Sequence, residues 1–498
     1  MILIKGVQIV DGSGKAPYRA DVILQGEKIS AIGNFPKKSA DVVIEGLGLY
    51  LTPGFIDVNT DSDHYLSLFT NPSQKDFLLQ GVTTIIGGNC GSSLAPLLYG
   101  SLESIRKWTN INQINVDWQT VADFLKVFNR IKLGVNFGTL VGHSTIRRAL
   151  IGEDFRDLTK SELAVFKRIV QQALEEGALG FSTGLGYAHS RQTPYGELKE
   201  LVKIVKDYGG VYATHLRNEH KGLIASVSET LKLAQETGVK TLISHFRPIL
   251  GFEKDFEDSL NLIENFEGSD LHFDSYPFDV SIVPVYTFLP HWAQNGGLEI
   301  MLANLDSEEI RARILKELPK FGPEDIIVAD IQLPDRFYLV GKMIGQIARN
   351  QGVSLNEALL RLMMMTRLRA LVIYKNVNLE LAVRALGYER ALVSSNAASF
   401  SENKQAIKHE RFFKTFPRFL EIADQQGRPS LEEVIQKFTS LPAEKFGFKD
   451  RGLVQEGYVA DLVLLQERKV QAVFVSGQMV IKDGKFQDIF AGKVLRRS

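Results

Sequence analysis

Thr83-Thr84-Ile85-Ile86-Gly87-Gly88-Asn89-Cys90 decides the fold, because it is a short apolar run that ends in small and polar residues. Such runs recur along the middle of the chain, and most are followed by a helical stretch. The eight runs are residues 54–59, 83–90, 136–143, 178–185, 211–217, 241–246, 271–277 and 391–396. Nearly continuous apolar strands are typical of a parallel sheet covered on both faces.

The segments between these runs carry helix signals. Thr159 and Glu162 form a capping box, and Gly177 closes the helix that follows. Eight such units favour a closed (β/α)8 TIM barrel over an open sheet. Polar residues also end runs that are far apart in sequence, and only a closed barrel brings these ends around one point. They are Asn59, Cys90, His143, His215, His245 and Asn396.

Both chain ends are rich in short strands and turns, and neither end alone could cover a sheet face. We therefore expect one composite β-sandwich domain from residues 1–53 and 449–498. The barrel would occupy residues 54–448, with a helical lid inserted within about 284–390, where the connection is too long for one crossover helix.

Composition excludes several classes of function. The 58 basic and 58 acidic residues balance, which argues against a nucleic-acid-binding protein. Cys90 is the single cysteine, so the chain forms no internal disulfide and fits a reducing compartment. The first residues lack a signal-peptide pattern, and no apolar run is long enough to span a membrane. These features predict a cytoplasmic protein; they do not predict its oligomeric state.

Three residues at predicted strand ends resemble metal ligands: Cys90, His215 and His245. Zinc accepts thiolate and imidazole, and three protein ligands plus water is its usual catalytic arrangement. Alone, a cysteine is more often a small buried hydrophobic residue and a histidine a hydrogen-bonded one. Together at the mouth of one barrel, they predict about one Zn²⁺ per chain.

The chain resembles the D-aminoacylase and N-acyl-D-amino-acid deacylase family of the amidohydrolase superfamily, over nearly its whole length. The resemblance rests on the order of several segments, any one of which would be weak evidence. They are residues 52–57, 81–84, 88–91, 140–143, 177–185, 212–217, 243–247, 274–277, 415–418, 450–452 and 456–462.

This resemblance implies an amidohydrolase-type barrel and zinc held by the cysteine and the two histidines. It implies hydrolysis of the N-acyl amide bond of N-acyl-D-amino acids or related linear amides by a zinc-activated water. Arg247, Arg411 and Tyr276 would bind the small-molecule N-acyl amino acid. Arg247 stands where the family usually has lysine, which keeps the positive charge and changes its geometry.

Two positions depart from the family pattern. The family's His-x-His after the first strand is replaced by Asn59 and Asp61, which weakens or removes any second metal site. The family's catalytic aspartate after the eighth strand is replaced by Asn396, and an amide is no general base near neutral pH. Asp61 is the preferred substitute for that base. Other candidate bases are Asp63, His64, His143 and His189.

Three functions remain open at this point. The first is an active metal-dependent amidohydrolase with Asp61 as the substitute base. The second is a catalytically impaired ligand-binding protein, which the residues at positions 59, 61 and 396 favour. The third is a lyase or isomerase on the same barrel, to which nothing in the sequence positively points. The acyl group, the side chain and the stereochemistry of the substrate are not encoded in a readable motif.

Overall fold

Eight parallel strands form the centre of the protein, in the order in which they occur in the chain. The computed structural model describes residues 1–36, 38–98, 102, 105–106, 109–268, 270–400 and 406–497. The central strands are β6 (Phe55–Asp57), β7 (Val82–Gly87), β8 (Asn136–Thr139) continued by β9 (Val141–Gly142), β10 (Gly180–Gly184), β11 (Val211–His215), β12 (Lys240–Ile243), β13 (Leu271–Ser275) and β17 (Ala391–Val393).

The ring closes where the eighth strand meets the first. Just beyond β17, the Asn396 amide donates to the Asn59 carbonyl at 2.9 Å, and the Asp61 amide donates to the Ala397 carbonyl at 2.8 Å. These bonds form a short parallel bridge, Thr60 with Ala397, beyond the ends of both strands. The predicted (β/α)8 barrel is therefore confirmed.

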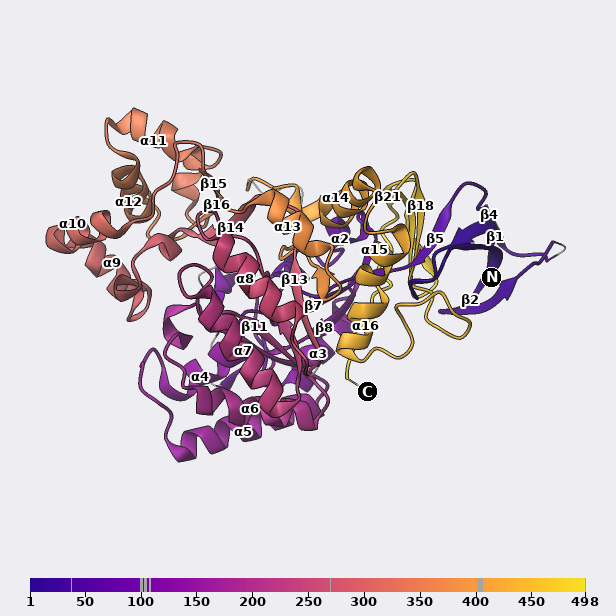
Figure 1. Ribbon diagram of the computed structural model, residues 1–498, viewed down its shortest axis with the longest axis horizontal. Coiled ribbons are helices and arrows are strands. Elements are labelled where there is room, and N and C mark those ends of the chain that lie inside the picture. The colour runs from indigo at the N-terminus through magenta and orange to yellow at the C-terminus, as the bar shows by residue number, and fades with distance from the viewer. Residues whose placement is uncertain are drawn as a thin grey trace.

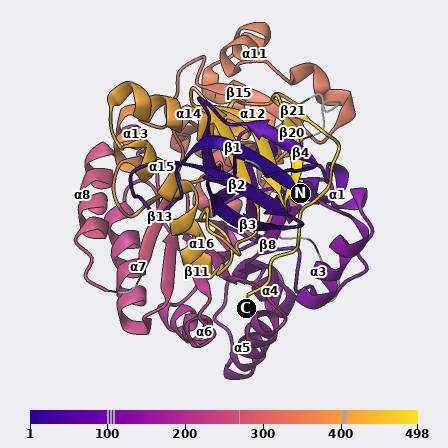
Figure 2. The same ribbon diagram turned by 90° about the vertical axis from the view of Figure 1, so that its right-hand side faces the viewer.

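Amphipathic helices surround the strands and form the periphery of the molecule in Figure 2. The predicted capping box at Thr159 and Glu162 begins α5, whose residues Phe166, Val170 and Leu174 are buried. The helices are α1 (Ser67–Thr70), α2 (Lys75–Leu78), α3 (Val121–Arg130), α4 (His143–Ile151), α5 (Lys160–Glu175), α6 (Tyr195–Asp207), α7 (Leu223–Thr237), α8 (Glu253–Glu264), α13 (Leu379–Leu386), α14 (Arg411–Gln426), α15 (Leu431–Phe438) and α16 (Ser440–Phe446). Among the described residues, none of the helices has the length and apolar character needed to cross a lipid bilayer.

The two chain ends share one nine-stranded sheet. Its strands are β1 (Ile2–Ile9), β2 (Tyr18–Gln25), β3 (Lys28–Gly33), β4 (Val42–Glu45), β5 (Tyr50–Pro53), β18 (Leu462–Gln466), β19 (Lys469–Val475), β20 (Gln478–Lys482) and β21 (Lys485–Phe486). Strand β5 connects the strands of the two chain ends, because it pairs with β1 in parallel orientation and with β18 in antiparallel orientation. Side chains from both ends, such as Leu51 and Leu462, share one buried core. The exact domain boundaries expected from the sequence stay a prediction.

The carboxylate of Asp461 joins this sheet to the barrel. It accepts hydrogen bonds from the Ser476 amide at 2.8 Å and from Asn136 Nδ2, on barrel strand β8, at 2.9 Å. Arg451 Nη1 lies 2.6 Å from the same carboxylate. Asp461 is only 4% exposed, so its charge is compensated by these partners rather than by water.

A large insertion follows β13 at the carboxyl end of the barrel, opposite the terminal sheet (Figure 1). It contains a three-stranded antiparallel sheet as well as helices, and it has its own apolar core. Its elements are β14 (Val280–Pro284), η5 (Val285–Phe288), η6 (His291–Gln294), α9 (Gly297–Asp306), α10 (Glu308–Glu317), β15 (Ile326–Ile331), η7 (Pro334–Leu339), α11 (Ile344–Gln351), α12 (Leu355–Met365) and β16 (Ala370–Lys375). The sequence predicted only helices here, because short apolar runs do not distinguish a buried strand from a buried helix.

Removing the Asp461 carboxylate should destabilise the protein. Asp461→Ala leaves the largely buried Arg451 without its partner, and breaking such a pair costs about 3 kcal/mol of unfolding free energy. Urea denaturation followed by circular dichroism measures the change. Glu421→Ala, at an exposed position of α14, is the matched control and should be near neutral. An equal effect of both substitutions would contradict the joining role of Asp461.

Candidate metal centre

Three side chains from three barrel strands converge at the carboxyl end of the barrel. Cys90 follows β7, His215 ends β11 and His245 follows β12. The Sγ atom of Cys90 lies 3.3 Å from Nε2 of His245, and Nδ1 of His215 lies 2.9 Å from the same nitrogen. The three ligand atoms all lie within 4.8 Å of one another. Cys90 and His245 are 5% and 3% exposed.

The backbone at this centre adopts an unusual conformation. Cys90, His245 and Asn396 have φ values of 53°, 38° and 43°, in the left-handed region that non-glycine residues rarely adopt. Each such residue costs about 1–3 kcal/mol unless its surroundings hold it in place. The surroundings do so here, because the His245 amide donates to Asp274 Oδ1 at 3.0 Å and the Asn396 amide to the Asn59 carbonyl. Hydrogen bonds within the site therefore hold the strained backbone at these strand ends in place.

Glu219 is part of this centre, although the sequence analysis did not single it out. Its Oε1 lies 3.1 Å from Nδ1 of His245, and its Oε2 lies 3.8 Å from Nε2 of His215 and 2.9 Å from Nη2 of Arg247. Burial alone would raise the pKa of Glu219, but Arg247 and both histidines hold it well below its usual range. A carboxylate behind a ligating histidine fixes the tautomer and orientation of the ring.

The three predicted substrate-binding residues contact one another in a chain. Arg247 Nη1 donates to the Tyr276 hydroxyl at 3.1 Å, and the Arg411 guanidinium lies over the Tyr276 ring, 4.5 Å from its centroid. Arg411 is 1% exposed, and its Nη2 donates to the Asn396 carbonyl at 2.7 Å. In this structure Arg411 thus supports the loop after the eighth strand.

Asn59 lies in the same buried network, beneath the metal centre. Its Nδ2 lies 3.2 Å from Oδ1 of Asp274, the oxygen that also accepts the His245 amide and the Ser394 hydroxyl. Asn59 therefore helps to position the Asp274 carboxylate, which in turn accepts the His245 backbone amide. Asn396 joins this network through its main chain, because its amide donates to the Asn59 carbonyl and its carbonyl accepts from Arg411.

Asp61 is paired with the buried His64. Oδ1 of Asp61 lies 3.0 Å from Nδ1 of His64, and Nε2 of His64 lies 3.2 Å from the Ser92 carbonyl. Both ring nitrogens face acceptors, which suits a doubly protonated imidazole. Burial alone would lower the pKa of His64, but the carboxylates of Asp63 and Asp61 raise it to about 9. The Asp61 side chain is 10% exposed and that of His64 only 1%.

Three other candidate bases serve elsewhere. Nε2 of His143 lies 2.8 Å from Glu197, and its ring packs against Phe166 of α5. Nδ1 of His189 accepts a hydrogen bond from Nη2 of Arg148 at 2.9 Å. Asp63 binds the Gly88 amide at 2.6 Å. Each of these three side chains is therefore already engaged in a contact that holds a loop or a helix in place.

The donor set fits a zinc ion. A thiol and two imidazoles converge in a nearly dry site, and the carboxylate of Glu219 stands behind both imidazoles. This matches the sulfur and nitrogen ligands that zinc prefers and the carboxylate–histidine arrangement that supports them.

The chain is similar to known proteins over its whole length. The model of the amidohydrolase family matches residues 362–480. The D-aminoacylase of Alcaligenes xylosoxydans xylosoxydans is 29% identical, over 100% of this chain and 98% of that protein.

Solved structures give the same result. The N-acyl-D-glutamate deacylase of Bordetella bronchiseptica, solved with zinc and a phosphonate inhibitor, is 25% identical and has a TM-score of 0.81, over 99% of both chains. A D-aminoacylase, described as activated by one metal and attenuated by a second, is 28% identical with a TM-score of 0.81, over 100% of this chain and 99% of that one.

The convergence of the three ligand atoms predicts metal binding that depends on Cys90. Cys90→Ala removes the thiolate and should abolish the zinc that copurifies with the protein or that is retained after zinc loading and dialysis. Elemental analysis measures it. His220→Ala is the control, because His220 is near His215 in sequence but outside the ligand cluster. Equal zinc in both variants would show that this cluster does not hold the ion.

Proposed function

The chain belongs to the D-aminoacylase and N-acyl-D-amino-acid deacylase family of the amidohydrolase superfamily, and on that basis we propose that it hydrolyses the N-acyl amide bond of N-acyl-D-amino acids or related linear amides. One observation carries the proposal: the ligand atoms of Cys90, His215 and His245 lie within 4.8 Å of one another at the barrel mouth. Amide hydrolysis needs a group that polarises the carbonyl, a group that moves protons, and groups that hold the substrate.

We propose that Cys90, His215 and His245 hold one zinc ion. A zinc ion bound there supplies a Lewis acid that polarises the amide carbonyl and makes water a nucleophile near neutral pH. A second ion lacks its imidazole ligands, because Asn59 and Asp61 occupy the positions of the family's His-x-His. Asn59 is already committed to Asp274.

The substrate carboxylate would bind at the side of strands β12, β13 and β17, where Arg247 and Tyr276 face each other. Nη2 of Arg247 is held by Glu219 and Nη1 by the Tyr276 hydroxyl, whereas its buried Nε has no hydrogen-bond partner among the described residues and would donate to a carboxylate. A hydrogen bond from a guanidinium to a carboxylate is stronger than a neutral one and would orient the substrate. Arg411 would assist by holding Tyr276 and the loop at Asn396.

Asp61 would move the proton. It is a carboxylate in the loop after the first barrel strand, and its side chain is 10% exposed, whereas Asn396 carries no group that accepts a proton near neutral pH. The buried His64 lies 3.0 Å behind it and holds a proton of its own. Asp61 can therefore accept a proton from water and return it to the leaving nitrogen while His64 stabilises its charge.

A second candidate function is ligand binding without catalysis. The amide of Asn396 at the position of the family's catalytic aspartate is the observation that favours it. The two candidates differ in turnover. Zinc-loaded protein is incubated with N-acyl derivatives of D- and L-amino acids, and release of the free amino acid is measured. Turnover of a D-derivative that stops on zinc removal supports hydrolysis, whereas no turnover of any substrate would leave binding alone.

Substitution of Asp61 should remove most of the activity. Asp61→Asn keeps the size of the side chain but cannot accept a proton, so kcat should fall by about 10²–10⁴-fold. Steady-state kinetics measure kcat, and elemental analysis verifies that zinc is retained.

The doubly substituted Asp61→Asn, Asn396→Asp protein tests whether a carboxylate after the eighth strand can take over. We expect it to recover at least part of the lost kcat. Wild-type activity in Asp61→Asn would rule out Asp61 as the base. Recovery only in the double variant would confirm that the missing group is a proton acceptor.

A further inference from the structure

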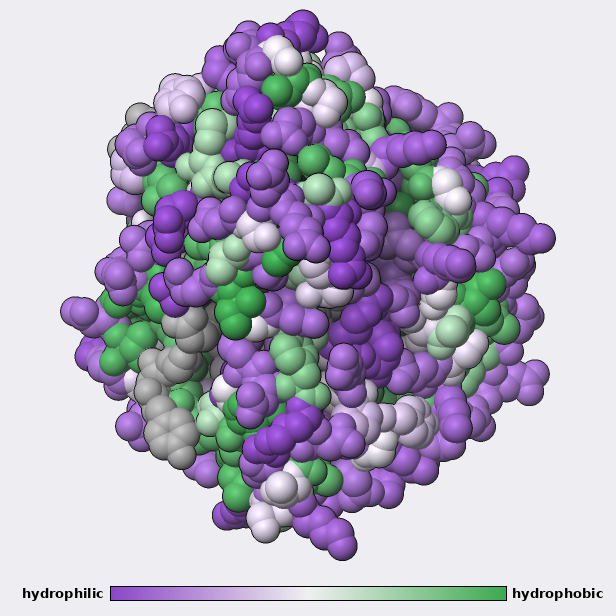
Figure 3. Space-filling view, turned by 90° about the vertical axis from the view of Figure 1, so that its left-hand side faces the viewer, coloured by the Kyte–Doolittle hydropathy of each residue, from purple (hydrophilic) through white to green (hydrophobic). Residues whose placement is uncertain are grey.

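A cavity beside the metal centre is lined by arginine side chains. Its empty volume is about 750 Å³, and part of it is open to solvent. It lies between the barrel and the insertion, and Tyr187 forms the wall that it shares with the metal centre, because the Tyr187 ring lies 4.9 Å from the ring of His215. Figure 3 looks onto this end of the molecule, where hydrophilic residues predominate and the surface is hollowed near its centre.

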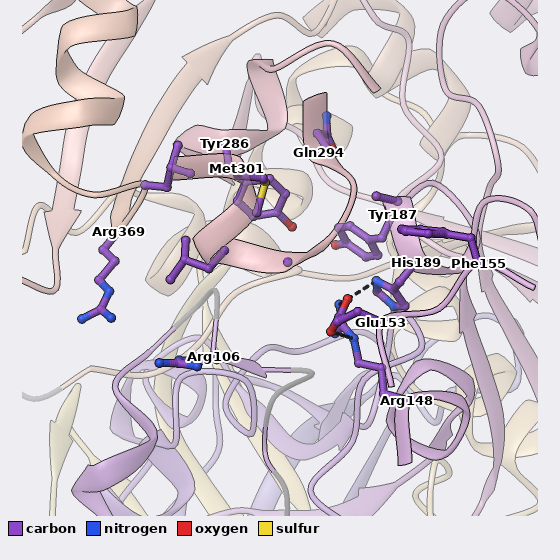
Figure 4. A pocket seen from close by; sticks show the side chains of 14 residues that line it. Arg106, Arg148, Glu153, Phe155, Tyr187, His189, Tyr286, Gln294, Met301 and Arg369 are labelled. Carbon is purple, nitrogen blue, oxygen red and sulfur yellow. Dashed lines mark hydrogen bonds and ion pairs between the residues drawn. The ribbon is translucent and has the colours of Figure 1, made fainter. Parts of the chain in front are cut away.

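The cavity has cationic and acidic side chains in its described lining. Arg106, Arg148 and Arg369 line it, together with one carboxylate, that of Glu153. Nε of Arg148 lies 2.8 Å from Glu153, which neutralises that one guanidinium. Arg106 and Arg369 lie on the other side of the cavity from this pair in Figure 4. Among the described residues that line the cavity, arginines therefore outnumber acidic residues.

Arg369 is the most informative of the three. Among the described residues, no acidic group lies within ion-pair distance of its guanidinium, although much of the residue is shielded from solvent. The chain directs it into the cavity through two consecutive left-handed residues, Arg367 and Leu368, with φ values of 48° and 59°. Leu368 is 3% exposed, so this strained turn is anchored in the core of the insertion.

The cavity lies across the barrel mouth from the proposed carboxylate site. Arg247 and Tyr276 follow the sixth and seventh barrel strands, whereas Arg148 and Tyr187 follow the third and fourth. The metal ligands, on the second, fifth and sixth strands, lie between them. In an N-acyl amino acid, the side chain branches from the carbon that carries the carboxylate. The acyl chain lies on the far side of the scissile amide, which is the side of this cavity.

We propose that this cavity binds an acyl group that ends in a carboxylate, so that the substrates are amino acids N-acylated with a dicarboxylic acid. This inference rests on the proposed function and names its substrate class. Hydrolysis breaks the C–N bond, adds the oxygen of water to the acyl carbon and leaves the nitrogen as a free amine. The products are a dicarboxylate and an amino acid.

The walls suit such a group. Tyr187, Tyr286 and Met301 provide apolar surface for the methylene groups of the acyl chain, and Arg369 provides the cationic end. A guanidinium that is not already paired can form two hydrogen bonds with a carboxylate, and in a partly desolvated site such a pair is stronger than in water. An acetyl group would leave the Arg369 guanidinium unused.

Three substrates of the zinc-loaded protein test the proposal: N-succinyl-D-leucine, N-acetyl-D-leucine and N-acetyl-D-glutamate. The first carries its second carboxylate on the acyl group, and the third carries it on the side chain. We expect kcat/KM for N-succinyl-D-leucine to exceed that for N-acetyl-D-leucine by about tenfold or more, mainly through KM. Arg369→Leu should bring this ratio close to one, and Arg369→Lys should keep part of it.

Arg361→Leu is the matched control, because Arg361 lies on α12 of the same insertion but outside the cavity. It should leave the ratio unchanged. A preference for N-acetyl-D-glutamate over N-succinyl-D-leucine, or a ratio that Arg369→Leu does not alter, would overturn the assignment of the acyl carboxylate.

Calorimetric titration with succinate separates this proposal from the proposed function, since it requires no turnover. Succinate should bind to the wild-type protein, and its Kd should rise about tenfold in Arg369→Leu but not in Arg361→Leu. Such binding without turnover of any substrate would refute hydrolysis and retain dicarboxylate recognition. Binding of succinate that is equal in all variants would overturn the cavity assignment even if hydrolysis is observed.

Discussion

The joint between the first and the eighth barrel strands is the constraint on which the rest of the site depends. Two backbone hydrogen bonds, Asn396 to Asn59 and Asp61 to Ala397, close the ring. The same bonds fix the positions of Asp61, the proposed proton acceptor, and of Asn396, which follows the eighth strand. Closure also seats the Asn59 amide against Asp274, whose carboxylate receives the His245 amide. A main-chain contact thus positions His245, a proposed metal ligand, through the side chains of Asn59 and Asp274.

Much of the fold was readable from the sequence, for a physical reason. Strands buried on both faces must be apolar almost throughout, so the runs ending at Cys90 or His245 stand out from their surroundings. The convergence of Cys90, His215 and His245 was also predictable, since the barrel topology brings strand ends to one point and cysteine and histidine are among the few residue types that bind zinc. The strands β14, β15 and β16 were missed because their apolar runs lie among helices with similar residues.

The remainder of the site could not be read in this way. Glu219 is one acidic residue among 58, and only the folded structure shows that it stands behind both histidines. The left-handed backbone at Cys90, His245 and Asn396 has no sequence signature, because none of these residues is glycine. Arg411 looked like a substrate contact, and the structure shows that it also holds the Asn396 carbonyl. Such roles depend on tertiary distance, not on local pattern.

The pairing of β5 with β18 has a consequence for how the protein is made. Residues near position 50 find their antiparallel partner only at residues 462–465, so these N-terminal residues leave the ribosome long before that partner is synthesised. Until then, the edge of β5 that β18 covers and the apolar face around Leu51 have no complete covering. Contacts of such long sequence separation form slowly. A chain interrupted before residue 462 would therefore carry the metal ligands and an unfinished, association-prone sheet at the same time.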